Sequence, residues 1–124
     1  MIAAILESGE PQRLYMGLSL LVSAAADGRP ARGLVGFGAL AALLGDDTDQ
    51  IPLDVPLPRR EAFARTLAEL RDAAAGLDDC RLWACAAAVE LTGIDRGLVE
   101  ARLDGVMSTP RFLAQVAGAD LVVV

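Results

Sequence analysis

Short apolar runs of strand length alternate with helix-like stretches along this chain, and this alternation restricts the fold more than any other feature. Ile2–Leu6 is a continuous apolar run, typical of a strand covered on both faces. Further strands are predicted at residues 32–37, 81–85, 105–107 and 120–124. Strands that alternate with helices favour a mainly parallel sheet. We therefore expect an α/β three-layer sandwich with about five strands and helices on both faces.

Helix signals lie between these strands. Pro11 suits a first helical turn, and apolar residues then recur at helical spacing until Asp27 and Gly28 end the helix. Other helices are predicted at residues 38–44, 59–75, 86–91 and 95–103, and from the N-cap Ser108 to about Ala117. The segment from Asp46 to Pro58 holds three prolines and four aspartates and is predicted to be irregular. Such long excursions usually serve a function or meet a partner.

The length and net charge of the chain indicate how many domains it forms and which kinds of partner it can bind. A chain of 124 residues is expected to form one domain, residues 1–124, around one modest core. Its net charge of −6 argues against a nucleic-acid-binding surface, which needs a basic patch. The longest apolar stretch, residues 14–26, is too short to span a membrane, and no basic residue precedes the first apolar run as in a secretory signal. We expect a cytoplasmic protein that binds neither nucleic acid nor membranes.

The chain contains no histidine, which excludes Cys–His and Ser–His–Asp catalysis and removes the commonest metal ligand. Its two cysteines, Cys80 and Cys85, lack zinc-site spacing, so we expect neither a metal nor a cofactor. In an extended strand these residues lie roughly 16 Å apart and point to opposite faces. A disulfide needs Cα atoms within about 7 Å, so both thiols are expected to be free.

Cys85 is the main candidate for chemistry because an apolar strand passes directly into a helix at this residue. Unpaired N–H groups and the helix dipole favour an anion there, so the residue is predicted to act as a thiolate nucleophile. The alternative is a small buried hydrophobic residue. Cys80 follows Asp78 and Asp79, whose charges disfavour a thiolate, so it is predicted to pack in the core.

Ligands of parallel sheets collect at the carboxyl ends of the strands, so the loops after Leu6, Phe37, Cys85 and Met107 should meet at one edge. Arg13 is a candidate source of positive charge near a thiolate, and Gly38 a position where a ligand can approach the backbone closely. The alternatives are a solvated helix start for Ser8, Arg13 and Tyr15 and a plain turn for Phe37 and Gly38. Ser108 and Thr109 begin a helix whose backbone amides could bind an anion, with an ordinary cap as the alternative. The candidate ligand-binding residues at this edge are Ser8, Arg13, Tyr15, Phe37, Gly38, Ala86 and Ser108.

The segment from Cys85 to Ile94, Cys-Ala-Ala-Ala-Val-Glu-Leu-Thr-Gly-Ile, resembles DsrE/DsrF-like proteins of the TusD-like sulfur-relay fold. In that family a sulfur-carrying cysteine ends a strand and is followed by small residues and a Gly-aliphatic pair. Looser matches cover nearly the whole chain, at residues 15–18, 25–28, 112–113 and 119–123. The resemblance implies a small α/β fold, assembly as a trimer or hexamer, and a persulfide on Cys85 that passes to a partner.

Three functional hypotheses follow. The leading one is a DsrE-like homo-oligomer in which the Cys85 thiolate carries sulfane sulfur to a protein or small-thiol acceptor, because such transfer needs neither histidine nor metal. The alternative is a non-catalytic oligomeric module of the same fold that binds a small ligand or regulates a partner. The third is a structural subunit that depends on a catalytic paralogue.

Overall fold

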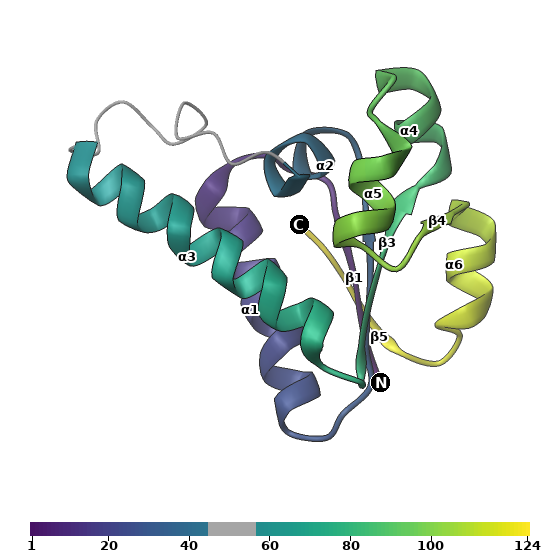
Figure 1. Ribbon diagram of the computed structural model, residues 1–124. Coiled ribbons are helices and arrows are strands. Elements are labelled where there is room, and N and C mark those ends of the chain that lie inside the picture. The colour runs from purple at the N-terminus through teal and green to yellow at the C-terminus, as the bar shows by residue number, and fades with distance from the viewer. Residues whose placement is uncertain (45–56) are drawn as a thin grey trace.

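A parallel sheet lies at the centre of the molecule (Figure 1). The computed structural model describes residues 1–44 and 57–124. The sheet has five strands in the order β4-β3-β2-β1-β5. These are β1 (Ile2–Leu6), β2 (Ala31–Val35), β3 (Cys80–Cys85), β4 (Val106–Met107) and β5 (Asp120–Val123). The predicted parallel sheet is confirmed, although β2 ends at Val35 because Gly36 and Phe37 turn the chain into the next helix.

Six helices connect the strands in the described residues: α1 (Pro11–Ala26), α2 (Phe37–Leu44), α3 (Leu57–Gly76), α4 (Ala86–Thr92), α5 (Arg96–Arg102) and α6 (Thr109–Gln115). The Glu10 carboxylate accepts from the backbone N–H groups of Gln12 and Arg13 and so caps α1. Each predicted helix is found. Residues 46–56 of the predicted irregular segment lie outside the described residues, whereas its last two residues belong to α3.

The chain order distributes the helices unevenly over the two faces of the sheet. From β1 to β4 each strand is added on the same side of the previous one, and right-handed crossovers then place α1, α3 and α5 on one face. The last connection returns to the far side of β1, so α6 crosses the opposite face (Figure 1). The three-layer α/β sandwich is confirmed, but within residues 1–44 and 57–124 one of its outer layers is the single helix α6.

The core follows from this layering. On the first face Leu14, Leu18 and Leu21 of α1 are buried against the sheet, as their spacing predicts. On the second face Phe112 of α6 is fully buried and meets Trp83 of β3 edge to face, with ring centroids 6.3 Å apart. This pair fixes α6 over the β3 side of the sheet.

The two cysteines are free and lie on opposite faces of β3, as the spacing predicts. Cys80 is 1% exposed, and burial raises the pKa of its thiol to about 11, with the negative charge of Asp104 acting in the same direction. The expected core role of Cys80 is therefore found. The charged group responsible is Asp104, which the fold brings to the strand, rather than the sequence neighbours Asp78 and Asp79.

The helices of residues 1–44 and 57–124 include none that is both long enough and apolar enough to cross a membrane.

Candidate functional site

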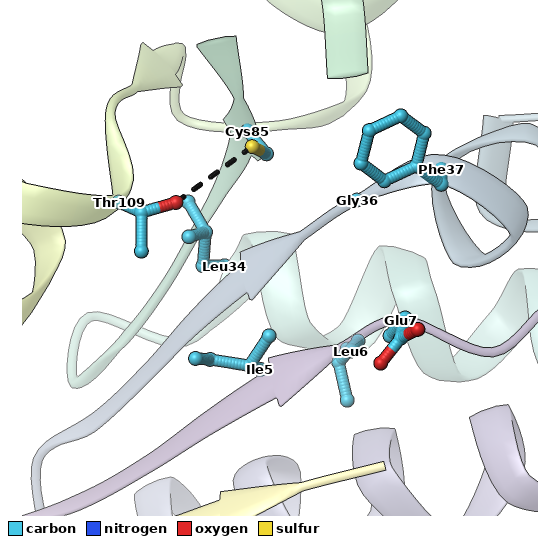
Figure 2. Close-up of a pocket in the computed structure, with 8 residues that line it drawn as sticks. All are labelled: Ile5, Leu6, Glu7, Leu34, Gly36, Phe37, Cys85 and Thr109. Carbon is cyan, nitrogen blue, oxygen red and sulfur yellow. Dashed lines mark hydrogen bonds between the residues drawn. The ribbon is translucent and has the colours of Figure 1, made fainter. Parts of the chain in front are cut away.

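The carboxyl ends of four strands meet around one pocket of about 210 Å³ (Figure 2). β1 contributes its last residues and Glu7, β2 is followed by Gly36 and Phe37, β3 ends at Cys85, and Thr109 comes directly after β4 and the Ser108 cap. Parallel strands bring these separate segments to one edge because their carboxyl ends point the same way. The lining residues are Ile5, Leu6, Glu7, Leu34, Gly36, Phe37, Cys85 and Thr109.

Cys85 stands where β3 passes into α4, as the sequence predicts. It occupies the N-cap position of α4, but its side chain makes no capping hydrogen bond. Its Sγ instead lies 4.0 Å from Oγ1 of Thr109, and either atom can be the donor (Figure 2). The residue is 8% exposed and belongs to the hydrophobic core cluster, and it also lines the pocket.

The pocket walls are mostly apolar. Ile5 and Leu34 are paired in register on neighbouring strands and lie on the same face of the sheet as Cys85. Thr109 supplies a hydroxyl, and Glu7 is the one charged residue among the lining residues. Pockets for drug-sized ligands usually measure about 300 Å³ or more, so this pocket suits a group of only a few heavy atoms.

Phe37 holds a strained backbone conformation at the rim of the pocket. Its φ of 42° is the one positive value at a non-glycine residue in the described part of the chain. A bulky residue adopts this conformation only where the surrounding structure enforces it, at a cost of about 1–3 kcal/mol. Phe37 is 47% exposed. Its ring lies beside the pocket (Figure 2). Strain of this kind is concentrated at functional sites.

Neighbouring backbone holds the start of α2, and therefore Phe37, in place. The Ala39 N–H donates to the Glu7 carbonyl over 3.0 Å. A Cβ atom at Gly9 would lie 2.7 Å from the Gly38 carbonyl oxygen, so the two glycine backbones are in direct contact. The close backbone approach expected at Gly38 is thus made by the chain itself at Gly9.

Two arginines hold the other end of α2. Arg71 of α3 donates through Nη1 to the Leu43 carbonyl over 2.9 Å, and Arg102 of α5 donates to the Leu44 carbonyl over 2.6 Å. The last carbonyls of a helix lack partners within the helix, and these guanidinium groups provide them. The element that carries Phe37 is therefore fixed at both ends.

Of the predicted site residues, the structure brings Cys85 and Phe37 together at the pocket. The Ser8 hydroxyl accepts from the Glu10 N–H, and the Ser108 hydroxyl accepts from the Arg111 N–H as an ordinary helix cap. The candidates outside the pocket lining are Ser8, Arg13, Tyr15, Gly38, Ala86 and Ser108.

Several lining residues were not among the sequence candidates, although each has a signal in the sequence. Glu7 and Gly36 are immediate neighbours of the candidates Ser8 and Phe37, and Thr109 was considered with Ser108 only as a helix start that could bind an anion. Ile5 and Leu34 follow from strand alternation once the register to β3 is known. That register depends on the folded sheet.

The described residues contain no group of three or more histidine, cysteine, aspartate or glutamate side chains arranged to hold a metal ion. No protein-family model matches the chain, and no curated protein shows significant similarity to it. The function is therefore argued from the chemistry of the pocket.

Proposed function

We propose that Cys85 carries a sulfane sulfur atom as a persulfide and passes it to an accepting thiol. The observation that carries this proposal is a cysteine at the carboxyl end of a parallel strand, beside a small pocket and opposite a hydroxyl group. The resemblance of residues 85–94 to the DsrE/DsrF-like proteins supports the same role. Homo-oligomeric assembly and a protein or small-thiol acceptor belong to this proposal.

The reaction needs no oxidant or metal, and the proton of the Cys85 thiol passes to solvent before the attack. The Cys85 thiolate attacks the terminal sulfur of a donor persulfide, its S–S bond breaks, and the donor leaves as a thiolate with the bonding electron pair. Cys85 then bears the additional sulfur. In the second step an acceptor thiolate attacks that terminal sulfur, the new S–S bond breaks, and the Cys85 thiolate is released.

The lining residues favour one class of donor. Apolar walls and the absence of a cationic side chain among them suit the uncharged body of an organic persulfide. Thiosulfate is a dianion, and Glu7 would repel it. We therefore expect Cys85 to accept sulfur from a persulfide of a small thiol or of a protein, in preference to thiosulfate.

Thr109 is a positioning residue in this proposal. Its hydroxyl lies within reach of the Cys85 sulfur and can donate to the thiolate or to the persulfide that forms. Thr109→Val preserves the side-chain shape and removes the donor. We expect slower sulfur uptake by a factor of about ten. The rate at which iodoacetamide alkylates Cys85 is measured in parallel. An unchanged alkylation rate shows that the variant has lost sulfur transfer and not access of reagents to the Cys85 sulfur.

Intact-mass measurement after incubation with a small-thiol persulfide tests the proposal. We expect wild type to gain one sulfur atom and Cys85→Ser to gain none. Cys80→Ala is the matched control, because Cys80 is buried on the other face of the strand and should not affect loading. The proposal is wrong if folded wild type gains no sulfur, or if the sulfur is found on Cys80.

A second candidate function is binding of a small apolar ligand without covalent chemistry. It is favoured by the apolar walls and by the low exposure of Cys85. In that case Cys85→Ser should still bind the ligand, and folded wild type should not react with persulfides. The loading experiment therefore separates the two functions.

A further inference from the structure

The outer edge of β5 is a strand edge without a partner in the described part of the chain. β5 is the last strand in the sheet order, and its inner side pairs in parallel with β1 (Figure 1). All residues of the strand are exposed, including Leu121 at 46% and Val123 at 61%. The strand has neither the proline nor the lysine that commonly protects an exposed edge.

The backbone groups at this edge have a fixed direction. The N–H groups of Asp120 and Val124 donate to Met1 and Ile5, so these residues, and Val122 between them, point toward β1. Successive residues of a strand alternate, so the N–H and C=O groups of Leu121 and Val123 point outward. No hydrogen bond to these outward groups is formed within the described residues.

The opposite edge of the sheet differs. β4 has only two residues, and the adjacent Asp104 turns its carboxylate inward to accept from the Leu82 N–H over 2.7 Å. A strand this short offers little backbone for pairing with another chain. The two edges are therefore unequal, and β5 is the edge available for extension.

We infer that β5 pairs antiparallel with β5 of a second copy of this chain, across a two-fold axis at Val122. With that axis Leu121 of each copy lies opposite Val123 of the other, and the two residues exchange both backbone hydrogen bonds. Every outward N–H and C=O group of the strand is then paired. The two sheets become one continuous sheet.

The side chains of β5 favour a second copy of this chain as the partner of its open edge. Each copy supplies the same uncharged row of Leu121, Val122 and Val123, so apolar side chains meet on both faces of the joined sheet. Asp120 is the charged residue of the strand. The two Asp120 residues would lie roughly 14 Å apart, at opposite ends of the paired strands, so they do not repel strongly.

α1 contributes to the same interface. Its Gly17 is close to Val124 at the end of β5, and a Cβ atom there would lie 3.6 Å from that side chain. Leu20 follows one turn later on the same side of the helix, and it is exposed. The two-fold axis is perpendicular to the joined sheet, so it places the α1 helices of both copies on the same face with these flanks toward each other. The exposed leucine is then covered by its symmetry mate.

Disulfide trapping tests both the contact and its register. Residues at the two-fold axis form a non-hydrogen-bonded pair with Cα atoms about 4.5 Å apart, which a disulfide can bridge. We expect Val122→Cys to form a covalent dimer under mild oxidation. Asp120→Cys, exposed on the same strand and face, is the matched control and should remain uncrosslinked. Equal crosslinking of both variants, or of neither, would overturn the inference.

A second measurement is independent of added cysteines. Val123→Pro removes an outward N–H group and leaves the bonds to β1 intact, and Leu121→Lys adds a charge at the same edge. By sedimentation over a range of concentrations we expect wild type to associate and both variants to lose this two-fold contact. Leu91→Lys, at a highly exposed leucine of α4, should associate as wild type does. A wild type that is monomeric at every concentration, or variants that associate unchanged, would refute the pairing.

Discussion

Replacing Cys80 with alanine removes a buried thiol whose ionisation opposes folding at high pH. In the folded protein burial raises the pKa of Cys80 from its ordinary value of 9.0 to about 11, and Asp104 adds to the effect. Since the folded-state pKa is the higher one, the unfolded chain loses this proton first as the pH rises. The resulting stability is fully present below about pH 9 and is lost progressively up to about pH 11.

The magnitude follows from the shift. A difference of one pKa unit corresponds to about 1.4 kcal/mol, so the free energy of unfolding of wild type should fall by about 2 to 3 kcal/mol across this range because of Cys80. Cys80→Ala has no thiol at this position, so its free energy of unfolding lacks this dependence on pH. Its stability is lower at neutral pH by about 1 kcal/mol because of the lost sulfur contacts, a cost that does not depend on pH.

Urea unfolding followed by circular dichroism at several pH values between about 7 and 11 measures the free energies of unfolding of wild type and of Cys80→Ala. The difference between the free energies of unfolding of wild type and Cys80→Ala cancels the contributions of all groups that the two proteins share. We expect that difference to shrink and then change sign as the pH rises. If the two curves stay parallel, Cys80 does not ionise differently in the folded and unfolded states, and the explanation from burial fails.

Two further predictions concern packing. Phe112→Ala removes the fully buried ring that holds α6 against Trp83, so the free energy of unfolding should fall by about 3–5 kcal/mol in urea titrations, and an effect below 1 kcal/mol would contradict this packing. Gly9→Ala places a Cβ atom against the Gly38 carbonyl and should lower the melting temperature. Gly76→Ala is the control, because a Cβ atom at this position at the end of α3 meets nothing within 4 Å. It should leave the melting temperature unchanged or raise it. Equal effects of the two alanines would contradict the close contact.

Part of the candidate site was predictable from local sequence. Cys85 stands out because an apolar strand leads directly into an alanine-rich helix, and the rule that ligands gather at the carboxyl ends of parallel strands places it at an edge. Phe37 was found by the same reasoning. Thr109 was considered with Ser108 only as a helix start that could bind an anion, because its position opposite the sulfur depends on where β4 pairs with β3.

Other features could not have been read from the chain. The positive φ of Phe37 lies at the start of α2, whose last carbonyls accept from the arginines of α3 and α5. The raised pKa of Cys80 depends first on burial of the thiol in the folded core and then on the negative charge of Asp104, which is distant in sequence but accepts a hydrogen bond from Leu82 of the same strand. Such effects depend on long-range contacts, which no local pattern specifies.

The sequence by itself determined the kind of fold. Apolar runs of strand length, helix caps such as Glu10 and Ser108, and the glycines that end helices all act within a few residues, so they specify strands and helices and their alternation. Only the tertiary structure decided the strand order, which is set by the packing of all the elements together. That order places α6 alone on one face, assembles the pocket around Cys85 from four strand ends, and leaves β5 as an open edge.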